Sequence, residues 1–415
     1  DLSEDFLDSL NTRLRSSGYN RGHSYRVSAG GFLSSRKDGP LRSLCGFYGF
    51  KHSDNKNETA RGFMTEQFVQ PSTTTQYNAN DYRQKETLGN LHLHWDCELG
   101  KNLRLLLQDR TEYSKKYDRD VLYHPDTLSL PSQLDALLAI TDVRNSYESD
   151  YRKFYNAPTV SLKWKKYIPG AYMKMEYLAW DLNFSNVIRS ERLSYMRNNT
   201  TQDKKRTSYE FIPSFNFKIL PTKKPGEQLN FNLMYQQGIA SMFDLLDYVD
   251  DAMPQVVKLG NPRLKGTAST TLSIQFTDWE SKHKGQSYHL QGNFNYYHRQ
   301  VAQSVVFNPD NSQYTYQPKN VSGAYHASAQ FDFTRFLDKR QRWSWQTTLN
   351  ANYNHSVDHV LQVGMTESSP NAVNTLTLHD GLWFQYQHQD LSLRATGDIR
   401  WRHSEGKMRD FTTLN

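Results

Sequence analysis

Apolar and polar residues alternate with a period of two along most of this chain, and this pattern constrains the fold more than any other feature. It is clearest after Thr87, where Leu91, Leu93 and Trp95 share one face and polar residues occupy the other. Successive side chains of a β-strand point to opposite faces of a sheet. No window approaches the roughly 18 consecutive apolar residues of a transmembrane helix. The sequence therefore predicts an all-β protein.

Segments of this kind recur to the end of the chain, and we count about fourteen predicted strands. Short turns, as at residues 37–40 and 100–102, alternate strictly with long connections such as 54–85 and 198–206. Outer-membrane barrels have this asymmetry because they turn tightly on the periplasmic side and extend long loops outside the cell. The pattern favours an antiparallel transmembrane β-barrel over a sandwich or propeller.

Composition agrees with a barrel better than with a water-soluble core. The 415 residues contain no Pro-, Gly- or Ser-rich linker, so we expect residues 1–415 to be part of one barrel domain. Aromatic residues make up 13% of the chain, but apolar residues reach only 37% and mean hydropathy is −0.80. A membrane barrel places rings in two interfacial girdles and keeps its other face polar.

Charge, cysteine and histidine usage point to no special chemistry. The net charge of +7 is modest and scattered, which gives nucleic-acid binding little support. Cys45 and Cys97 fit no zinc or redox spacing, and free thiols are favoured over a disulfide. His92 and His94 project from one face of a strand, where two metal ligands are conceivable but a polar lumen wall explains them better.

The most distinctive string lies in residues 231–276, which read as strand, long loop, strand. Within the loop, Gly260, Asn261, Pro262, Leu264 and Lys265 form the sequence Gly-Asn-Pro-x-Leu-Lys. A simple turn explains Gly-Asn-Pro taken alone. In its hairpin context the string resembles a loop of TonB-dependent outer-membrane receptors, and is most similar to the outer-membrane β-barrel family common in Bacteroidetes.

The resemblance implies active import of a nutrient such as a glycan, peptide or metal chelate. It also implies a barrel of about 22 strands, of which this chain would cover the middle. The N-terminal plug, which contacts a TonB-type energy-coupling protein, and the last strands would lie outside the chain. The implied location is the bacterial outer membrane, with membrane lipid as a partner and a surface lipoprotein as a further candidate partner.

A second candidate site is the acidic and aromatic group Phe243, Asp247, Tyr248, Asp250 and Asp251 in the same loop. Rings beside carboxylates suit sugars, cations or peptides, so this group is a candidate extracellular ligand surface, although a solvated loop also explains it. Ser241 and Asp244 have helix-capping spacing, which predicts an ordered turn of helix over residues 242–249.

No catalytic motif stands out. The sequence lacks a nucleophile elbow, a phosphate loop, a dinucleotide fingerprint and a His-Glu-x-x-His string, so we expect neither an enzyme nor a cofactor. Two other functions stay open at this stage. One is a barrel for secretion, assembly or adhesion that imports nothing, and the other is a secreted, soluble all-β binding protein.

Overall fold

A computed structural model describes residues 12–36, 41–67, 72–123, 141–169, 176–221, 226–253, 255–278, 285–308, 310, 312–360, 368–406 and 411–414. These residues form eighteen β-strands and no helix, and some strand-end residues are described by their backbone alone. Nothing in the described ranges is a helix long and apolar enough to cross a membrane. The predicted all-β, antiparallel fold is confirmed.

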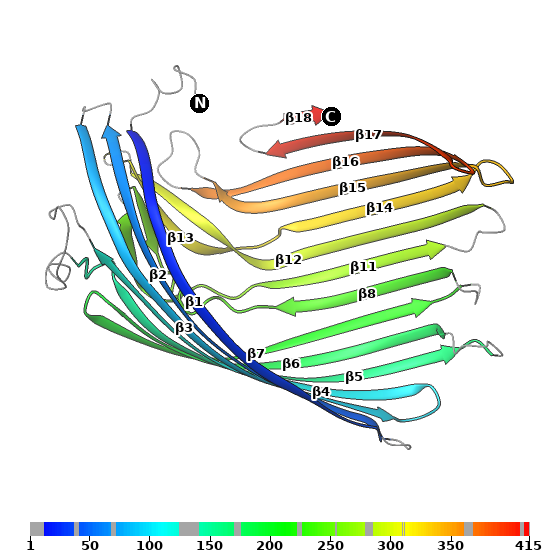
Figure 1. The fold of residues 1–415 in the computed structure, drawn as a ribbon, viewed down its shortest axis with the longest axis horizontal. Coiled ribbons are helices and arrows are strands. Elements are labelled where there is room, and N and C mark those ends of the chain that lie inside the picture. Colours follow the sequence, from blue (N-terminus) through cyan, green and yellow to red (C-terminus); the bar gives the residue numbers. More distant parts are fainter. Residues whose placement is uncertain are drawn as a thin grey trace.

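Fifteen strands pair in chain order as an antiparallel meander, which we call the wall (Figure 1). They are β1 (Thr12–Arg36), β2 (Leu41–Gln67), β3 (Ser72–Glu98), β4 (Leu103–Tyr123), β5 (Tyr147–Tyr167), β6 (Glu176–Arg197), β7 (Thr200–Ile219), β8 (Glu227–Gln237), β11 (Ala268–Asp278), β12 (Gln286–Asn308), β14 (Tyr325–Phe336), β15 (Trp343–Val360), β16 (Ser369–His388), β17 (Leu391–Gly406) and β18 (Phe411–Leu414).

Three further strands form a side ribbon: β9 (Val249–Met253), β10 (Val256–Leu259) and β13 (Gln313–Val321). β9 and β10 pair antiparallel, and β10 pairs in parallel with β13. β13 is held by the distal half of β12, because residues 300–308 leave the wall and pair with it. The ribbon therefore branches from the wall at β12.

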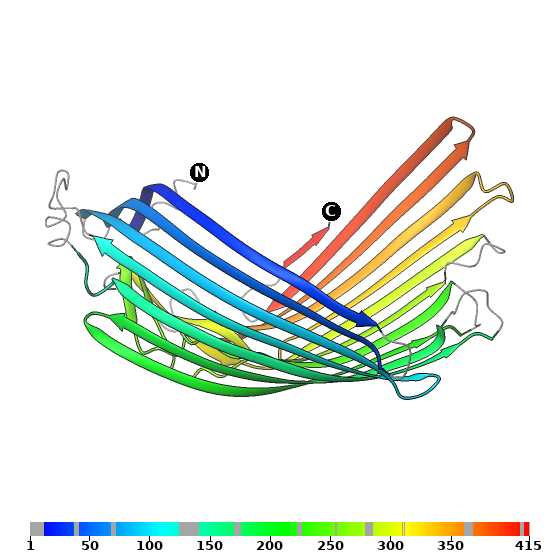
Figure 2. The ribbon, with the colours of Figure 1, turned by 60° about the horizontal axis from the view of Figure 1, so that its bottom comes forward.

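The wall is an open, strongly curved trough (Figures 1 and 2). Within the described residues no backbone pairing joins β1 to β17 or β18. The sequence led us to expect part of a larger barrel, and the described strands form an open sheet. Closure requires the first and last strands of a barrel to share a ladder of hydrogen bonds, and these two edges share none.

Cross-strand partners lie on the same face of a sheet, so the register sorts the side chains into two faces. One row consists of Trp180, Phe217, Phe231 and Ile274, and its face is called the outer face. The adjacent row on the opposite, inner face consists of Asn216, Asn232, Ser273, Asn293, Ser328 and Asn352. Hydrogen bonds link Asn216 with Asn232, Ser273 with Asn293 at 2.8 Å, and Asn293 with Ser328 at 3.4 Å.

Aromatic rings gather at two levels of the outer face. Near the short turns, Trp164 stacks with Trp180 at 6.4 Å, and Trp345 stacks with Phe384 at 6.2 Å. Toward the other end, Tyr325 stacks with Tyr353 at 5.8 Å. Trp345 and Tyr353 both lie on β15, and the strand rise places them about 27 Å apart along it.

Several predicted long connections are in fact strands. Most of residues 54–85 belongs to a ladder in which β2 and β3 pair from Leu41 to Gln67, and the predicted 198–206 loop is a two-residue turn. Asn198 and Asn199 both have positive φ, as a hairpin turn of type I′ requires. The sequence reading failed here because strands beyond the apolar band are polar on both faces.

The structure also tests the predictions for the two cysteines and for the helix at residues 242–249. The two cysteines are free thiols, and they cannot face one another because Cys45 pairs with His94 on the inner face while Cys97 shares the outer face with Trp95. The predicted helix at 242–249 is wrong, since residues 242–245 form turns and Val249 begins β9.

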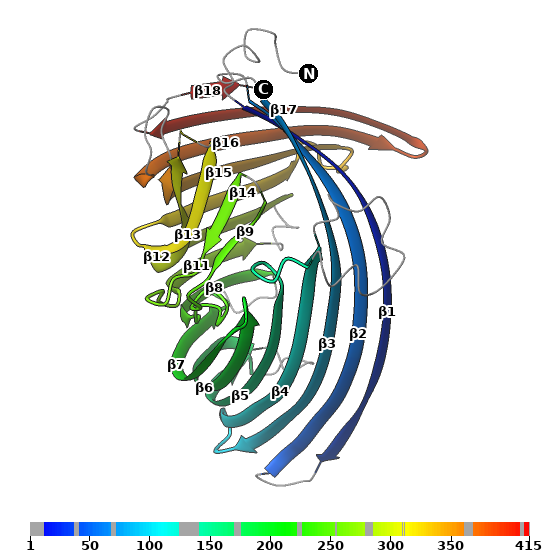
Figure 3. The same cartoon turned by 90° about the vertical axis from the view of Figure 1, so that its left-hand side faces the viewer.

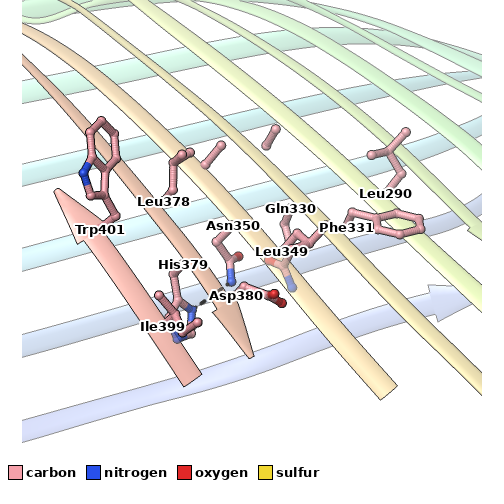
Figure 4. A pocket seen from close by; sticks show the side chains of 12 residues that line it. Leu290, Gln330, Phe331, Leu349, Asn350, Leu378, His379, Asp380, Ile399 and Trp401 are labelled. Carbon is pink, nitrogen blue, oxygen red and sulfur yellow. Dashed lines mark hydrogen bonds between the residues drawn. The ribbon is translucent and has the colours of Figure 1, made fainter. Parts of the chain in front are cut away.

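A shallow apolar groove of about 420 Å³ lies on the outer face of β12 and β14–β17 (Figure 4). Ala329 and Ala351 pair across β14 and β15 and leave space between larger neighbours. Leu349, Leu378 and Ile399 line the groove, and the Asp380 carboxylate lies among them. Small side chains on this outer row thus leave a depression in an otherwise bulky apolar surface.

The short turn between β14 and β15 is organised by one carboxylate. Asp338 Oδ1 accepts hydrogen bonds from the backbone N–H of Arg342 at 2.7 Å and of Trp343 at 2.9 Å, and Arg342 Nε donates to Oδ2 at 3.2 Å. These donors favour the charged carboxylate, with the Trp343 N–H the largest cause, and lower the pKa of Asp338.

We expect a site-specific carbon NMR titration of Asp338 to give a midpoint below about 3.9, the value of an unperturbed Asp. Because the folded pKa is depressed, the stabilisation of this turn is present above the unfolded pKa and is lost as the pH falls through the folded pKa. In Arg342→Gln the midpoint should rise but stay below the ordinary value, since the backbone donors remain. A wild-type midpoint at or above 3.9 contradicts this account of the turn.

Candidate functional site

The connection between β8 and β11, residues 238–267, folds onto the inner face of the wall, and we call it the mouth loop. It contains β9 and β10, and β9 lies within the curve of the wall (Figure 3). The loop packs against the ends of β5, β6 and β7 that lie far from the short turns. It therefore occupies the inside of one end of the trough.

An apolar contact anchors the mouth loop. Met242 and Leu246 pack against Leu193 and Tyr195 of β6, and the side chains of Leu193 and Leu246 are fully buried. Phe243 adds a ring contact with the edge of Tyr195 at 6.4 Å. Burying a leucine side chain stabilises a fold by roughly 1.5–3 kcal/mol, so this contact is a main source of loop ordering.

Arg197, at the end of β6, is the polar centre of the site. Its side chain is only 8% exposed, and its Nη2 lies 3.2 Å from Asp250 Oδ1. Nη2 also donates to Asn145 Oδ1 at 2.6 Å, and Nε donates to the carbonyl of Arg144 at 2.8 Å. The guanidinium lies 5.6 Å from the ring centre of Tyr248. A buried guanidinium is tolerated because its donors are used.

A second set of polar contacts fixes the rest of the loop. Asp251 pairs with Arg144 at 2.9 Å and accepts a hydrogen bond from Asn145 Nδ2 at 2.9 Å. Asp247 exchanges hydrogen bonds with the Gln202 amide through its backbone N–H and carbonyl, at 3.2 and 2.6 Å. The mouth loop is thus joined to the connection between β4 and β5 and to the first residues of β7.

These contacts show where the predicted acidic and aromatic group lies. Phe243, Tyr248 and Asp250 come together around Tyr195 and Arg197, whereas Asp247 is exposed. The carboxylates of Asp250 and Asp251 point to arginines of the protein itself. Holding the loop is thus their observed role, and binding of an external ligand stays a prediction.

Burial is the largest cause of the pKa shifts in the mouth loop. It raises the pKa of the Asp244 carboxyl and the pKa of the Tyr248 phenol. The Tyr195 hydroxyl accepts a hydrogen bond from Arg197 Nη1 at 3.3 Å. Within the described residues no group of three or more His, Cys, Asp or Glu side chains could hold a metal ion.

The Gly-Asn-Pro-x-Leu-Lys string is part of the mouth loop and joins it to β13 of the side ribbon. Asn261 donates from its backbone N–H to the Asp244 carbonyl at 2.6 Å and from Nδ2 to the Pro318 carbonyl at 2.7 Å. A side chain at Gly260 would place its Cβ 1.9 Å from the Leu246 carbonyl oxygen. Only glycine allows the two backbone segments to approach this closely.

The remaining residues of the string complete the same junction. Leu264 is buried, Pro262 is exposed, and the backbone N–H of Lys265 donates to Asn320 Oδ1 at 2.8 Å. Asn320 returns a bond from Nδ2 to the Lys265 carbonyl at 2.8 Å. The sequence analysis found the string but missed Arg197 and Asn320, because their partners are distant in sequence and neither has a local signal.

No protein-family model matches the chain, and no curated protein matches its sequence. Solved structures similar to it include a ferric enterobactin receptor of Pseudomonas aeruginosa, with 9% identity, TM-score 0.30, and coverage of 95% of this chain and 72% of that chain. The siderophore receptor PirA of the same organism has 10% identity and a TM-score of 0.31, and the match covers 91% of this chain and 73% of that chain.

A third similar structure is the ferric yersiniabactin uptake receptor FyuA of Yersinia pestis, with 7% identity and TM-score 0.39. The match covers 97% of this chain and 65% of that chain. Identities of 10% or below and TM-scores below 0.5 leave any functional assignment to the residues of this chain.

Substituting Gly260 with alanine should release the mouth loop, because the new Cβ would overlap the Leu246 carbonyl. We expect a loss of about 1–3 kcal/mol in loop stability, the usual cost of overpacking. Faster amide exchange over residues 241–265, read by mass spectrometry, would report the release.

Gly89→Ala is the matched control, because a Cβ at Gly89 meets no atom within 4 Å. It should leave exchange in the mouth loop unchanged. Equal exchange in wild type and Gly260→Ala would show that the close approach at Gly260 is not needed to hold the loop.

Proposed function

We propose that this chain forms the wall of an outer-membrane β-barrel, with its outer face against lipid. The observation that carries the proposal is the division of one sheet into two chemically different faces. Large apolar side chains on the outer face are exposed, among them Ile274 at 47%, Leu290 at 48% and Phe384 at 46%. A soluble monomer rarely exposes so extensive an apolar surface.

The spacing of the aromatic levels fits a membrane. About 27 Å along a strand tilted by about 40° corresponds to a height of about 20 Å, close to the roughly 25 Å apolar band of outer-membrane barrels. The rings lie at both limits of this band, where membrane–water interfaces favour amphipathic aromatic side chains. This match disfavours a secreted, soluble binding protein.

Two carboxylates on the outer face need an explanation under this proposal. Asp109 accepts hydrogen bonds from Asn156 Nδ2 at 2.7 Å and from Thr111 Oγ1 at 3.0 Å. Asp380 accepts one from Thr347 Oγ1 at 3.1 Å. Such bonds reduce the cost of polar groups in lipid, and that cost is smaller for Asp than for Lys or Arg.

The inner face suits a wet lumen or an inserted domain. Its Asn and Ser row is uncharged and hydrogen-bonded from strand to strand. Together with the mouth loop and the resemblance of its Gly-Asn-Pro string, this supports a TonB-dependent receptor that imports a nutrient such as a glycan, peptide or metal chelate. In this proposal the short turns face the periplasm, and a plug couples the wall to a TonB-type protein.

Spin labels should divide according to the two faces. In a Cys45→Ser/Cys97→Ser background reconstituted in lipid, outer-face labels should be relaxed by oxygen, which concentrates in lipid, and inner-face labels by a nickel chelate in water. The outer positions are Leu93, Phe217 and Tyr353, and the inner positions are His92, Asn216 and Asn352. Nickel access at the outer positions, with the inner ones shielded, would exclude a membrane wall.

Import itself predicts energy-dependent uptake. Intact cells producing the full-length protein should accumulate at least one of three labelled probes: a ferric tris-catecholate, an oligosaccharide or a tripeptide. A protonophore should reduce that uptake at least tenfold, because TonB coupling draws on the inner-membrane gradient. Cells without the protein provide the baseline, and uptake equal to it for every probe favours a barrel for secretion, assembly or adhesion.

A further inference from the structure

The outer face of β3 and β4 becomes basic directly beyond the aromatic level that lies farther from the short turns. On β4 the outer positions after Tyr113 are Lys115, Tyr117 and Arg119, and on β3 they change from apolar to Lys85 and Arg83. These side chains surround a depression of about 400 Å³, which we call the basic recess. Its charged lining residues are Arg83, Lys85, Lys115, Arg119 and Asp150, and His52 also lines it.

The positive charge of the recess is only partly neutralised by the protein. The Asp150 carboxylate is shared between Arg152 at 2.8 Å and Lys115 at 3.4 Å. Asp54 pairs with Arg83 at 2.8 Å. Among the residues that the structure describes, Lys85 and Arg119 have no ion pair. The recess therefore presents two cations that form no ion pair, beside two that are already paired. Asp54 lies opposite Lys85 in the strand register and offsets part of its charge, and Glu148 lies opposite Arg119.

The height of the recess matches the lipid headgroups. Lys115 follows Tyr113 by two residues, which is about 7 Å along the strand and about 5 Å in height at a tilt of about 40°. The headgroup region of one leaflet is about 5–8 Å thick. If Tyr113 marks the edge of the apolar band, the recess lies at the level of headgroup phosphates.

We propose that the basic recess binds the phosphate groups of a phosphorylated glycolipid in the outer leaflet. Arginine and lysine donate charge-assisted hydrogen bonds to phosphate oxygens, and cations close to a membrane surface attract anionic lipid. The Tyr113 and Phe154 rings, 46% and 44% exposed, lie below the cations as a surface for the sugar and acyl parts of the lipid. The inference rests on the proposed outer-membrane location.

The partner is a lipid rather than a soluble phosphate compound because of where the recess opens. Its lining side chains occupy outer positions of β2–β5, on the same face as the apolar band, and not inner positions beside the mouth loop. A soluble ligand on its way through the trough would meet the inner face. A headgroup anchored in the surrounding leaflet meets the outer face.

The test is retention of lipid by the full chain in nanodiscs, read by native mass spectrometry. The probes are an acylated glucosamine disaccharide with two phosphates and the same lipid without phosphate. We expect Lys85→Gln/Arg119→Gln to reduce retention of the phosphorylated probe at least tenfold. The control is Lys339→Gln/Arg340→Gln, which makes the same charge change in the exposed turn at the opposite end of the wall and should leave retention unchanged.

A second measurement needs no substitution. The phosphorylated probe should protect Lys85 of the wild-type protein from acetylation, and the dephosphorylated probe should not. This comparison stays decisive even if the double variant folds poorly.

Three results would overturn the inference. They are equal retention of the two lipids, equal loss in the control variant, and inorganic phosphate alone protecting Lys85 as well as the lipid does. A chain that does not insert into the nanodisc, judged by oxygen access at Phe217, contradicts the proposed outer-membrane function. A chain that inserts but retains the phosphorylated and dephosphorylated lipids equally contradicts only the proposal that the basic recess binds phosphate.

Discussion

The antiparallel register of the wall is the constraint on which every other feature depends. From β1 to β18, through β8–β11 and β12–β14, each strand pairs with its neighbour so that apolar rows stay in phase. Side chains alternate between faces, and a shift of one residue at any ladder would move that strand's leucines and rings to the inner face. The register therefore maintains both the outer apolar band and the inner polar row.

The mouth loop shows how an irregular segment is held on a polar face. Leu246 and Met242 pack against Leu193 and Tyr195 among further aromatic rings, but such apolar contact is non-directional and does not by itself fix the orientation of the loop. Arg197 fixes the orientation of the loop, because its planar guanidinium must contact Asp250, Asn145 and the Arg144 carbonyl at the same time. Asn261 Nδ2 donates to the Pro318 carbonyl and the Gly260 carbonyl accepts from the Gln317 amide, which joins the loop to β13 of the side ribbon. Predicted ligand residues thus serve first as structural contacts.

The outer face carries more functional information than any single residue does. A row of rings, an apolar band, a second row of rings and then cations follow one another along β3–β5. This order is the one in which a strand crossing a bilayer meets interface, hydrocarbon, interface and headgroup. No individual side chain in the series is unusual, and their order along the strand supports a membrane location.

The sequence by itself determined the strands of the apolar band. The period of two predicted β5 over residues 147–167 and the all-β, antiparallel architecture, because alternation is a local property of the backbone. The same signal failed at residues 198–206, where Asn198 and Asn199 make a tight turn and the strands continue with both faces polar.

Only the tertiary structure decided how the trough is filled and where its charges lie. The Asn261 side chain donates a hydrogen bond to the carbonyl of a residue 57 positions away in the sequence. Arg197 at the end of β6 forms an ion pair with Asp250 of β9. Lys85 and Lys115 line one recess only because the register places β3 and β4 side by side. Such contacts depend on strand pairing and loop folding, which bring together residues whose local sequence contains no trace of their partners.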